Sequence, residues 1–350
     1  FRLPRVPSVY LFKNAVDEVL YVGKATNLRQ RVRSYFNGDD RRKVGRLLHE
    51  TASIETETTA NEFEAQVREV RLIHKYEPHY NYQVKNWRKY SFASLTLDEK
   101  YPRLIVARNA HMRDDRFNIG PLSSRAQAQT VIDAIHSVTR LRRCTKLPSS
   151  RRDVTPCLAA QLGTIDCVCT GAVSVEEYAE MVAGVVDQLS NNPNELLKAL
   201  RLKMTQLAKK ERFEDAAEMR DRADTLARIL IRQAQIGAVQ KHGHLVLRAA
   251  DRSHIQLSHG RVVAVTFDNQ LSFDRDHVCN DECPINASIH PNTVDELLCV
   301  TRFIDRQFDS LEVVESSSQF VWPRDEIDRI VPKEPSRQRP LPSRCSTAVA

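Results

Sequence analysis

The amino-acid sequence predicts an α+β protein with several domains. Short apolar runs that are typical of strands alternate with longer segments whose apolar residues recur every three or four positions, as in amphipathic helices. The chain has 350 residues, of which 41% are hydrophobic. This length exceeds one typical domain and allows two or three modest cores.

Residues 1–98 are expected to form one compact module in which helices flank a small mixed sheet. Its elements follow the order strand, strand, helix, helix, strand, helix, with strands at residues 9–12, 19–22 and 54–58. The first helix has an apolar stripe formed by Leu28, Val32, Tyr35 and Phe36. The last helix has a stripe formed by Phe63, Val67, Val70 and His74. Glu69 is off this stripe and free to line a cleft; an ordinary surface glutamate is the alternative.

Two tyrosine-bearing strands of this module lead into a basic helix. Tyr10 and Tyr21 lie in the strands, Lys24 follows the second strand, and Arg31 and Tyr35 are one helical turn apart. Phosphodiester cleavage needs an activated oxygen nucleophile, cations for the developing phosphate charge, and usually a metal held by a carboxylate. The pattern gathers such groups, although most tyrosines in strands only pack within sheets.

This stretch resembles the GIY-YIG nuclease module, and the order of its motifs is similar to the N-terminal half of the UvrC family of excision-repair endonuclease subunits. The matching segments are Ser8-Val9-Tyr10, Tyr21-Val22-Gly23-Lys24-Ala25, Asn61-Glu62-Phe63-Glu64-Ala65 and Tyr76-Glu77-Pro78-His79-Tyr80-Asn81. The resemblance covers roughly the first two thirds of the chain. It implies seven catalytic residues, which are Tyr10, Tyr21, Lys24, Arg31, Tyr35, Glu69 and Asn81.

The resemblance also implies a role for several of these residues. Tyr10 would take the proton from the attacking water or orient it, and Tyr21 would help to position the nucleophile. Arg31 would bind the scissile phosphate, and Glu69 would hold a single Mg or Mn ion. Because a tyrosine with a pKa of about 10 is a poor base at neutral pH, we expect Lys24 and the metal to favour the ionised form of Tyr10.

Three positions depart from the family pattern. Ser8 replaces a glycine, which would cost on the order of 1 kcal/mol if the backbone needs a positive φ there, or would block the approach of DNA. Asn86 replaces an acid and Arg71 replaces an asparagine. The alternative to an active nuclease is therefore a catalytically impaired scaffold.

The chain has a net charge of +7, and its basic residues are concentrated in two places. In the first cluster we expect DNA binding by Arg29, Arg33, Arg41, Arg42 and Lys43. The second cluster, for which DNA binding and a solvated surface are equally good explanations, contains Arg140, Arg142, Arg143, Lys146, Arg151 and Arg152.

A cytoplasmic protein without membrane contact is expected. No apolar run approaches the roughly 20 residues that span a bilayer, and the N-terminus has no secretory signal. The first residue is Phe1 rather than Met, which is consistent with a fragment of a longer protein.

Residues 99–192 are expected to form a connecting region with a cysteine cluster. Strands at 92–97 and 104–108 would extend or flank the nuclease sheet, a helix would begin at Ser124, and a capping box at Ser174 would start another. The resemblance implies an iron-sulfur cluster, zinc would suit the same thiolates, and plain thiols are the alternative for Cys144, Cys157, Cys167 and Cys169. Their spacing departs from the family, because Ile165 occupies a cysteine position.

Residues 193–231 are predicted to form an antiparallel helical hairpin that starts at Pro193. Its sequence resembles the UVR motif, through which UvrC proteins pair with UvrB. The resemblance implies a UvrB-like partner, and core packing is the alternative role for the hairpin. The residues expected to bind that partner are Phe213, Ala216, Ala217 and Arg220.

Residues 232–332 are expected to form a C-terminal α+β domain whose role the resemblance does not supply. Strands are predicted at 244–248, 254–258 and 261–267, followed by a helix at 292–308 and a strand at 311–315. Three acids could suggest a remnant acidic site, but surface turns explain them better: Asp251, Asp268 and Asp276. Residues 333–350 are rich in Pro, Ser and Arg and are expected to be disordered.

These inferences predict a metal-dependent DNA endonuclease that makes a single incision in nucleotide excision repair or a related process. The competing hypothesis is a UvrC-like scaffold, impaired by Ser8, that binds DNA and a UvrB-like partner. Replacing Ser8 with glycine discriminates between the two.

Overall fold

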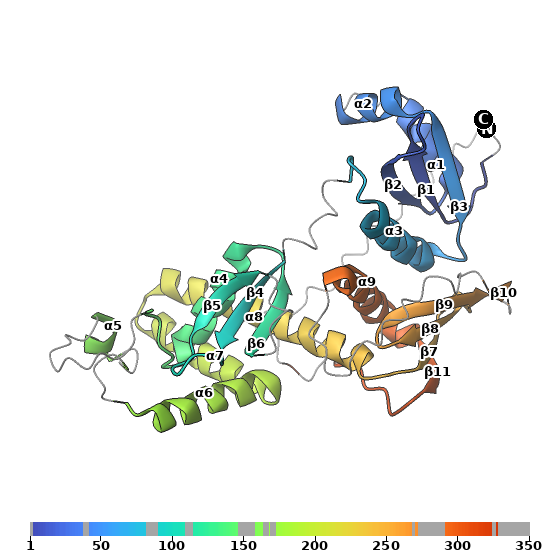
Figure 1. Ribbon diagram of the computed structural model, residues 1–350. Helices are drawn as coiled ribbons and strands as arrows, with labels where there is room; N and C mark the ends of the chain where they lie inside the picture. Colours follow the sequence, from blue (N-terminus) through green and yellow to red (C-terminus); the bar gives the residue numbers. More distant parts are fainter. Residues whose placement is uncertain are drawn as a thin grey trace, which may run out of the picture.

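The computed structural model describes residues 3–37, 42–81, 90–108, 115–145, 158–163, 168, 173–267, 270–271, 291–323 and 327. The predicted α+β class is confirmed, because helices accompany three small antiparallel sheets in this part of the chain. Figure 1 shows three bodies, which we call the N-terminal module (residues 3–81), the middle part (90–231) and the C-terminal part (236–323).

The N-terminal module has the predicted order of elements. They are β1 (Ser8–Lys13), β2 (Val19–Ala25), α1 (Leu28–Phe36), α2 (Arg42–Glu50), β3 (Ser53–Thr58) and α3 (Glu62–Tyr76). The sheet order is β2-β1-β3, and both pairs are antiparallel, where a mixed sheet was predicted. Asn27 and Asn61 begin α1 and α3, because each side chain accepts a hydrogen bond from a backbone N–H of the first helical turn.

Alternation along β1 separates two small cores. Tyr10 and Phe12 pack in one core with Leu28 of α1, whereas Val9 and Leu11 pack on the other side of the strand with α3. The predicted stripe of α1 is buried at Leu28, Val32 and Tyr35. Its fourth member, Phe36, is 59% exposed because it is the last residue of the helix and lies beyond the edge of this core.

The middle part contains a sheet of its own. Its strands β4 (Ser91–Thr96), β5 (Leu104–Arg108) and β6 (Arg116–Leu122) pair in the order β5-β4-β6. The prediction that the first two would extend or flank the nuclease sheet is therefore wrong. They pair instead with β6, a strand that the sequence analysis missed because Gly120 and Pro121 interrupt it.

The helices α4 (Arg125–Val138) and α8 (Phe213–Gln240) pack on this second sheet. Between them in the chain lie α5 (Leu158–Gln161), α6 (Val175–Ser190) and α7 (Pro193–Lys209). Ser124 caps α4, Ser174 and Glu177 form the predicted capping box of α6, and Pro193 is the first residue of α7. The helix starts predicted at Ser124, Ser174 and Pro193 are therefore confirmed.

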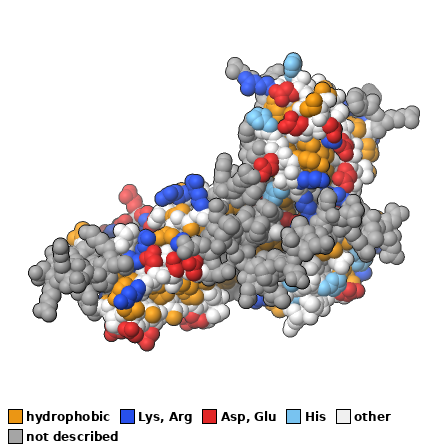
Figure 2. Space-filling view, in the orientation of Figure 1, with side chains coloured by type: hydrophobic (Ala, Val, Ile, Leu, Met, Phe, Trp, Pro, Cys, Tyr) orange, Lys and Arg blue, Asp and Glu red, His pale blue; other side chains and the backbone are white. Residues whose placement is uncertain are grey.

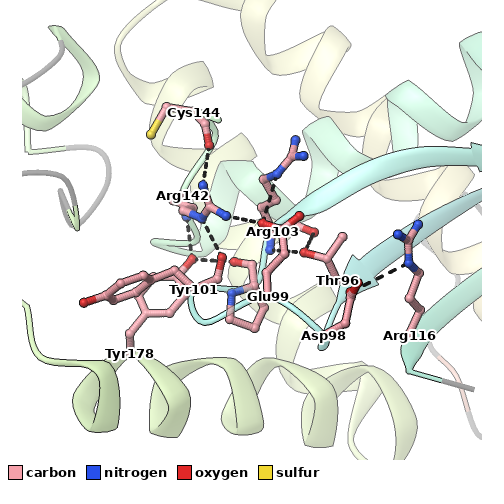
Figure 3. A network of polar contacts seen from close by, with 10 residues as sticks. Thr96, Asp98, Glu99, Tyr101, Arg103, Arg116, Arg142, Cys144 and Tyr178 are labelled. Carbon is pink, nitrogen blue, oxygen red and sulfur yellow. Dashed lines mark hydrogen bonds and ion pairs between the residues drawn. The ribbon is translucent and has the colours of Figure 1, made fainter. Parts of the chain in front are cut away.

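A buried arginine ties the β4–β5 turn to α6 (Figure 3). Arg142 is 1% exposed, forms an ion pair with Glu99 and donates from Nε to the carbonyl oxygen of Tyr101 at 2.6 Å. The Tyr178 hydroxyl accepts from the Arg142 backbone N–H at 2.9 Å and donates to the carbonyl oxygen of Pro102 at 2.8 Å. Arg142 was predicted as part of a basic cluster, but it is buried within the structure and cannot contact DNA.

The helix α8 (Phe213–Gln240) connects the middle and C-terminal parts. It forms the predicted hairpin with α7, but it continues nine residues beyond the predicted end at 231. Leu226 and Leu230 belong to the core of the middle part, whereas Ile236 and Val239 belong to the core of the C-terminal part. One helix therefore contributes to two cores.

In the described residues, the C-terminal part combines a five-stranded antiparallel sheet with the long helix α9 (Pro291–Gln307). Its order is β10-β9-β8-β7-β11. The elements are β7 (Leu245–Arg248), β8 (His254–Ser258), β9 (Arg261–Phe267), β10 (Gln270–Leu271), α9 (Pro291–Gln307) and β11 (Glu312–Ser316). His259 and Gly260 both have positive φ and form the predicted hairpin turn. None of the helices in the described ranges is long and apolar enough to cross a membrane.

The helix α3 is buried on two sides. Ala65 and Ile73 pack on the sheet of the N-terminal module with Val9 and Val22. The apolar residues of the predicted stripe pack instead in the core of the C-terminal part, where they are Phe63, Val67 and Val70. Figure 1 shows α3 between the sheet of the N-terminal module and α9.

Candidate functional site

The two motif tyrosines and the tyrosine of α1 form one aromatic cluster. The ring centroids of Tyr10, Tyr21 and Tyr35 are between 6.0 and 6.3 Å apart. The Tyr10 hydroxyl is 2.9 Å from the Tyr35 hydroxyl and accepts a hydrogen bond from Nε of Arg31 at 3.1 Å. The guanidinium carbon of Arg31 lies 5.2 Å from the Tyr35 ring centroid. The first helix therefore brings a cation and a third phenol to the two strands.

The pKa values of these tyrosines are all raised, so the phenols are neutral near pH 7. Burial is the largest cause, and it raises the pKa of Tyr10 to about 12. Burial also raises the pKa of Tyr21 and of Tyr35. The charge of Arg31 lowers all three pKa values. The cation beside Tyr10 is thus Arg31, whereas Lys24 was expected to act on it.

Gly23 leaves the space that the Tyr10 hydroxyl occupies. The two residues are opposite each other in the β1–β2 pair, and a Cβ atom on Gly23 would lie 2.4 Å from the Tyr10 hydroxyl oxygen. No side chain can therefore replace this hydrogen without moving the phenol. The glycine of the Tyr21-Val22-Gly23 motif signals this role in the sequence, although it is not among the seven residues that the resemblance implies.

Glu69 lies on the face of α3 that is directed toward β2. Its Oε1 accepts a hydrogen bond from the backbone N–H of Lys24 at 3.2 Å. Burial raises the pKa of the Glu69 carboxyl, against the lowering effect of the Lys24 and Arg31 charges. The Lys24 ammonium lies 3.4 Å from Glu62 Oε1, and the sequence analysis did not assign this second carboxylate to the site.

Asn81 fixes the backbone of β2 beside the tyrosines. Its Oδ1 accepts from the Val22 N–H at 2.9 Å, and its Nδ2 donates to the Val22 carbonyl at 2.8 Å. Asn81 is 5% exposed, and both polar atoms of its amide are hydrogen-bonded inside the protein. It holds the strand between Tyr21 and Gly23.

The seven residues implied by the resemblance lie in one region but differ in access to solvent. Tyr10, Tyr35 and Asn81 are buried. The remaining four are partly or largely exposed, and they are Tyr21, Lys24, Arg31 and Glu69. One phenol, two cations and one carboxylate can therefore meet a bound molecule.

Two carboxylates lie near Lys24, and of these Glu69 is the one that the resemblance assigns to a metal ion. In the described ranges no group of three or more His, Cys, Asp or Glu side chains is arranged to hold a metal. Mg²⁺ does not need such a group, because it usually keeps several waters and binds through one or two carboxylates. Burial raises the pKa of the Glu69 carboxyl, and a cation bound there would favour its charged form. The residues therefore fit a water-rich Mg²⁺ site at Glu69.

The residues expected to bind DNA are only partly described. Arg33 is exposed on α1, and Arg29, on the same helix, is partly buried. Arg42 and Lys43 begin α2, but their side chains lie outside the described residues, as does the whole of Arg41. On the face shown in Figure 2, basic and acidic side chains are interspersed over the N-terminal module.

Ser8 is an ordinary strand residue. It begins β1, is fully buried, and donates from Oγ to the carbonyl oxygen of Val6 at 3.1 Å. It is not among the residues of the described chain that have a positive φ. The backbone cost considered for this serine therefore does not apply here.

The predicted cysteine cluster cannot be assembled from the described residues. Cys144 is described, and its carbonyl oxygen accepts from Nη1 of Arg142 at 2.9 Å. Cys157, Cys167 and Cys169 lie outside the described residues, as does Asn86.

The residues of the hairpin that were expected to bind a partner differ in exposure. Phe213 is 66% exposed at the start of α8, and Arg220 is exposed and paired with Asp221 at 2.9 Å. Ala216 is buried, and Ala217 is partly buried.

Three family descriptions match successive segments of the chain. The UvrC-like GIY-YIG domain matches residues 6–82, the UvrC/Cho excinuclease middle domain matches residues 90–188, and the UvrB/uvrC motif matches residues 194–226.

Curated relatives and a solved domain are similar to parts of the chain. The UvrABC system protein C of Clostridium kluyveri is 36% identical over 234 residues, which are 66% of this chain and 38% of that protein. The protein of the same name from Rickettsia bellii is 34% identical over 251 residues, which are 69% and 39%. The GIY-YIG N-terminal endonuclease domain of UvrC from Thermotoga maritima, bound to its catalytic divalent cation magnesium, is 44% identical. This likeness covers 23% of the chain and 88% of the domain, with a TM-score of 0.22. The chain spans about two fifths of the length of the curated relatives it matches.

Proposed function

Because this chain is a UvrC-like protein, we propose that it is a metal-dependent DNA endonuclease of the GIY-YIG class that makes a single incision in nucleotide excision repair or a related process. The convergence of Tyr21, Arg31 and Glu69 beside one strand pair carries this proposal. These are the kinds of groups that hydrolysis of a phosphodiester requires.

The residues that reach the surface are assigned to contact with the substrate. Arg31 is assigned to the scissile phosphate, because a guanidinium presents paired N–H donors to phosphate oxygens. Tyr21 is assigned to hold the attacking water, and its ionised form, which the Arg31 charge and a cation at Glu69 would favour, would accept the proton of that water. It is the partly exposed tyrosine of the cluster, and the Glu69 charge acts on its pKa. Lys24 adds positive charge near Glu62 and Glu69.

The buried residues of the site are assigned to positioning. The resemblance implies that Tyr10 takes the proton from the attacking water or orients that water, but Tyr10 has no exposed surface. Its hydroxyl is bonded to Arg31 and Tyr35, which favours a role in holding the guanidinium in place. Asn81 holds the β2 backbone in the same way.

Glu69 is assigned to hold Mg²⁺ or Mn²⁺. When bound, such a cation would offset the charge that develops on the leaving oxygen. It would also compensate the Glu69 charge, which is one cause of the raised Tyr21 pKa.

A single incision is proposed because the described residues supply one site of this kind. Of the three acids considered in the C-terminal part, Asp251 accepts hydrogen bonds from Asn61 and Ser253, and Asp268 and Asp276 lie outside the described residues.

The proposal is tested by nicking of a lesion-bearing duplex with Mg²⁺ or Mn²⁺. We expect Glu69→Ala to lower the nicking rate by about 100-fold and Tyr10→Phe to lower it by about tenfold. Glu55→Ala is the matched control, since Glu55 is a carboxylate of the same module that pairs with Lys13 at 2.5 Å. If Glu69→Ala and Tyr10→Phe nick as fast as the parent protein, the proposal is wrong.

Restoring glycine at position 8 tests the scaffold hypothesis. Because Ser8 is buried in an extended strand, we expect Ser8→Gly to nick within about twofold of the parent rate, with a loss of stability below about 1 kcal/mol. A change from no cleavage to cleavage would favour the scaffold.

DNA and a UvrB-like protein are the proposed partners. The exposed Phe213 and Arg220 of the hairpin support a contact with that protein, and Ala216, being buried, supports the fold of the hairpin. Running the nicking assay with and without a UvrB-like protein tests the partnership together with catalysis.

A further inference from the structure

The C-terminal part contacts the helix that carries Glu69. On α3, Glu69 and Arg71 are two residues apart and therefore lie on roughly opposite faces of the helix. The Glu69 face is directed toward β2, and the other face is covered by α9 and β9 of the C-terminal part.

Polar contacts run along this covered face. His74 Nε2 lies 2.9 Å from Asp295 Oδ2, and the Tyr90 hydroxyl donates to Asp295 Oδ1 at 2.5 Å. At the other end of the helix, Asn61 Nδ2 donates to Ser253 Oγ at 2.9 Å. The contact is therefore specific as well as apolar.

A buried ion pair lies at the centre of the contact. Arg71 donates from Nε to Oε2 of Glu296 at 3.0 Å and from Nη2 to Oε1 at 2.6 Å. Its Nη2 also donates to the carbonyl oxygen of Val262 at 2.6 Å, and Glu296 Oε1 accepts from the Val262 N–H at 2.8 Å. Glu296 is 2% exposed. This bidentate arrangement fixes both the distance and the orientation between α3 and the C-terminal part.

We propose that Arg71 is a positioning residue for the carboxylate of Glu69, and that the C-terminal part acts through the Arg71–Glu296 pair as a brace that sets metal binding in the nuclease site. This inference rests on the proposed function, because it needs Glu69 to hold the cation. It assigns a role to the C-terminal part, whereas the resemblance supplies no role for residues 232–332. It also accounts for an arginine where the family pattern has an asparagine.

The physical basis is the rigidity of a helix. The 15 residues of α3 move together, so a rotation or shift released on the Arg71 face also displaces Glu69. A displacement of about 1 Å in a catalytic group can lower a rate by about 100-fold. The ion pair opposes such motion, because neither charge can leave the interface without losing its buried partner.

The test uses the full chain and two readouts. Mn²⁺ binding is measured from the electron paramagnetic resonance signal of free Mn²⁺, and nicking is measured against Mg²⁺ concentration. We expect Glu296→Gln to weaken Mn²⁺ binding and to raise the Mg²⁺ concentration for half-maximal nicking, each by about tenfold. Should Glu296→Gln fail to fold, Arg71→Lys provides the same test with a smaller shift, because it keeps the charge and loses the bidentate geometry.

The matched control is a second ion pair with one buried partner, Arg142, and it is remote from α3. Glu99→Gln removes the partner of Arg142 in the middle part. We expect Glu99→Gln to lower the unfolding temperature as Glu296→Gln does, while leaving Mn²⁺ binding at the parent value. Unchanged Mn²⁺ binding in the Glu296→Gln and Arg71→Lys proteins, or an equal loss in Glu99→Gln, would overturn the brace.

One further variant separates this inference from the proposed function. Glu69→Ala should abolish the Mn²⁺ binding of the nuclease site. If Glu69→Ala binds Mn²⁺ as the parent does, the proposed function fails; if it loses Mn²⁺ while the Arg71 and Glu296 variants keep it, only the brace fails.

Discussion

The Tyr10 hydroxyl lies where a side chain on Gly23 would have to be. We therefore expect Gly23→Ala to displace Tyr10, to break its hydrogen bond with Arg31, and to lower both stability and nicking. Overpacking of this kind costs about 1–3 kcal/mol. Urea unfolding and the nicking assay measure the two effects.

Gly45→Ala is the control for this change. Gly45 lies in α2, where an added Cβ would have nothing within 4 Å. It should gain up to about 1 kcal/mol from helix propensity and nick at the parent rate. Equal losses in both glycine variants would show that Gly23 has no special relation to Tyr10.

The raised pKa of Glu69 makes this carboxylate a source of instability in metal-free protein. A carboxyl whose pKa is raised by folding destabilises the fold as pH rises from its ordinary pKa through the raised one. We therefore expect Glu69→Gln to unfold at a higher temperature than the parent at neutral pH in the presence of a chelator. Below pH 4.5, the ordinary value for this group, the two proteins should unfold at nearly the same temperature.

Thermal unfolding followed by circular dichroism at both pH values checks this expectation. A gain of the same size at both pH values would mean that the charge of Glu69 is not its cause. No gain at neutral pH would mean that the burial of Glu69 does not disfavour its charged form.

At the scale of elements, local patterns predicted the helices and strands well. Ser124 and Ser174 each stand at a predicted helix start, because a capping side chain needs only the first turn of its own helix. Pairing partners were not predictable in this way. Strands β4 and β5 have the same composition whether they join the nuclease sheet or β6, and the choice depends on residues far along the chain.

The third helix shows the same limit. Its apolar stripe and the position of Glu69 off that stripe were apparent from spacing, and the structure agrees with both. Spacing did not reveal that the stripe packs on the C-terminal part, since period alone does not say which neighbour covers a face. Nor did it reveal Glu62 beside Lys24 or the pairing of Arg71 with Glu296.

At the scale of the whole molecule, α8 couples two cores. We expect Ala234→Pro to cost about 3 kcal/mol or more, because it removes a helical hydrogen bond in the segment between Ile231 and Ile236. Calorimetry should then show separate unfolding transitions for the middle and C-terminal parts.

The control for the proline variant is Ala234→Gly. It should cost about 1 kcal/mol and keep the transitions of the parent protein, because the backbone N–H remains. Separate transitions in the glycine variant would attribute the effect to the lost methyl group rather than to the interrupted helix.

The sequence by itself determined the α+β class, the helix starts, and the residue types of the site in their order along the chain. These features depend on neighbours in sequence, so local spacing and motif order were sufficient. The tertiary structure alone decided which tyrosines are buried, that Arg31 rather than Lys24 meets Tyr10, and that α3 is held between two parts of the molecule. These features depend on contacts between residues far apart in the chain, which no local pattern specifies.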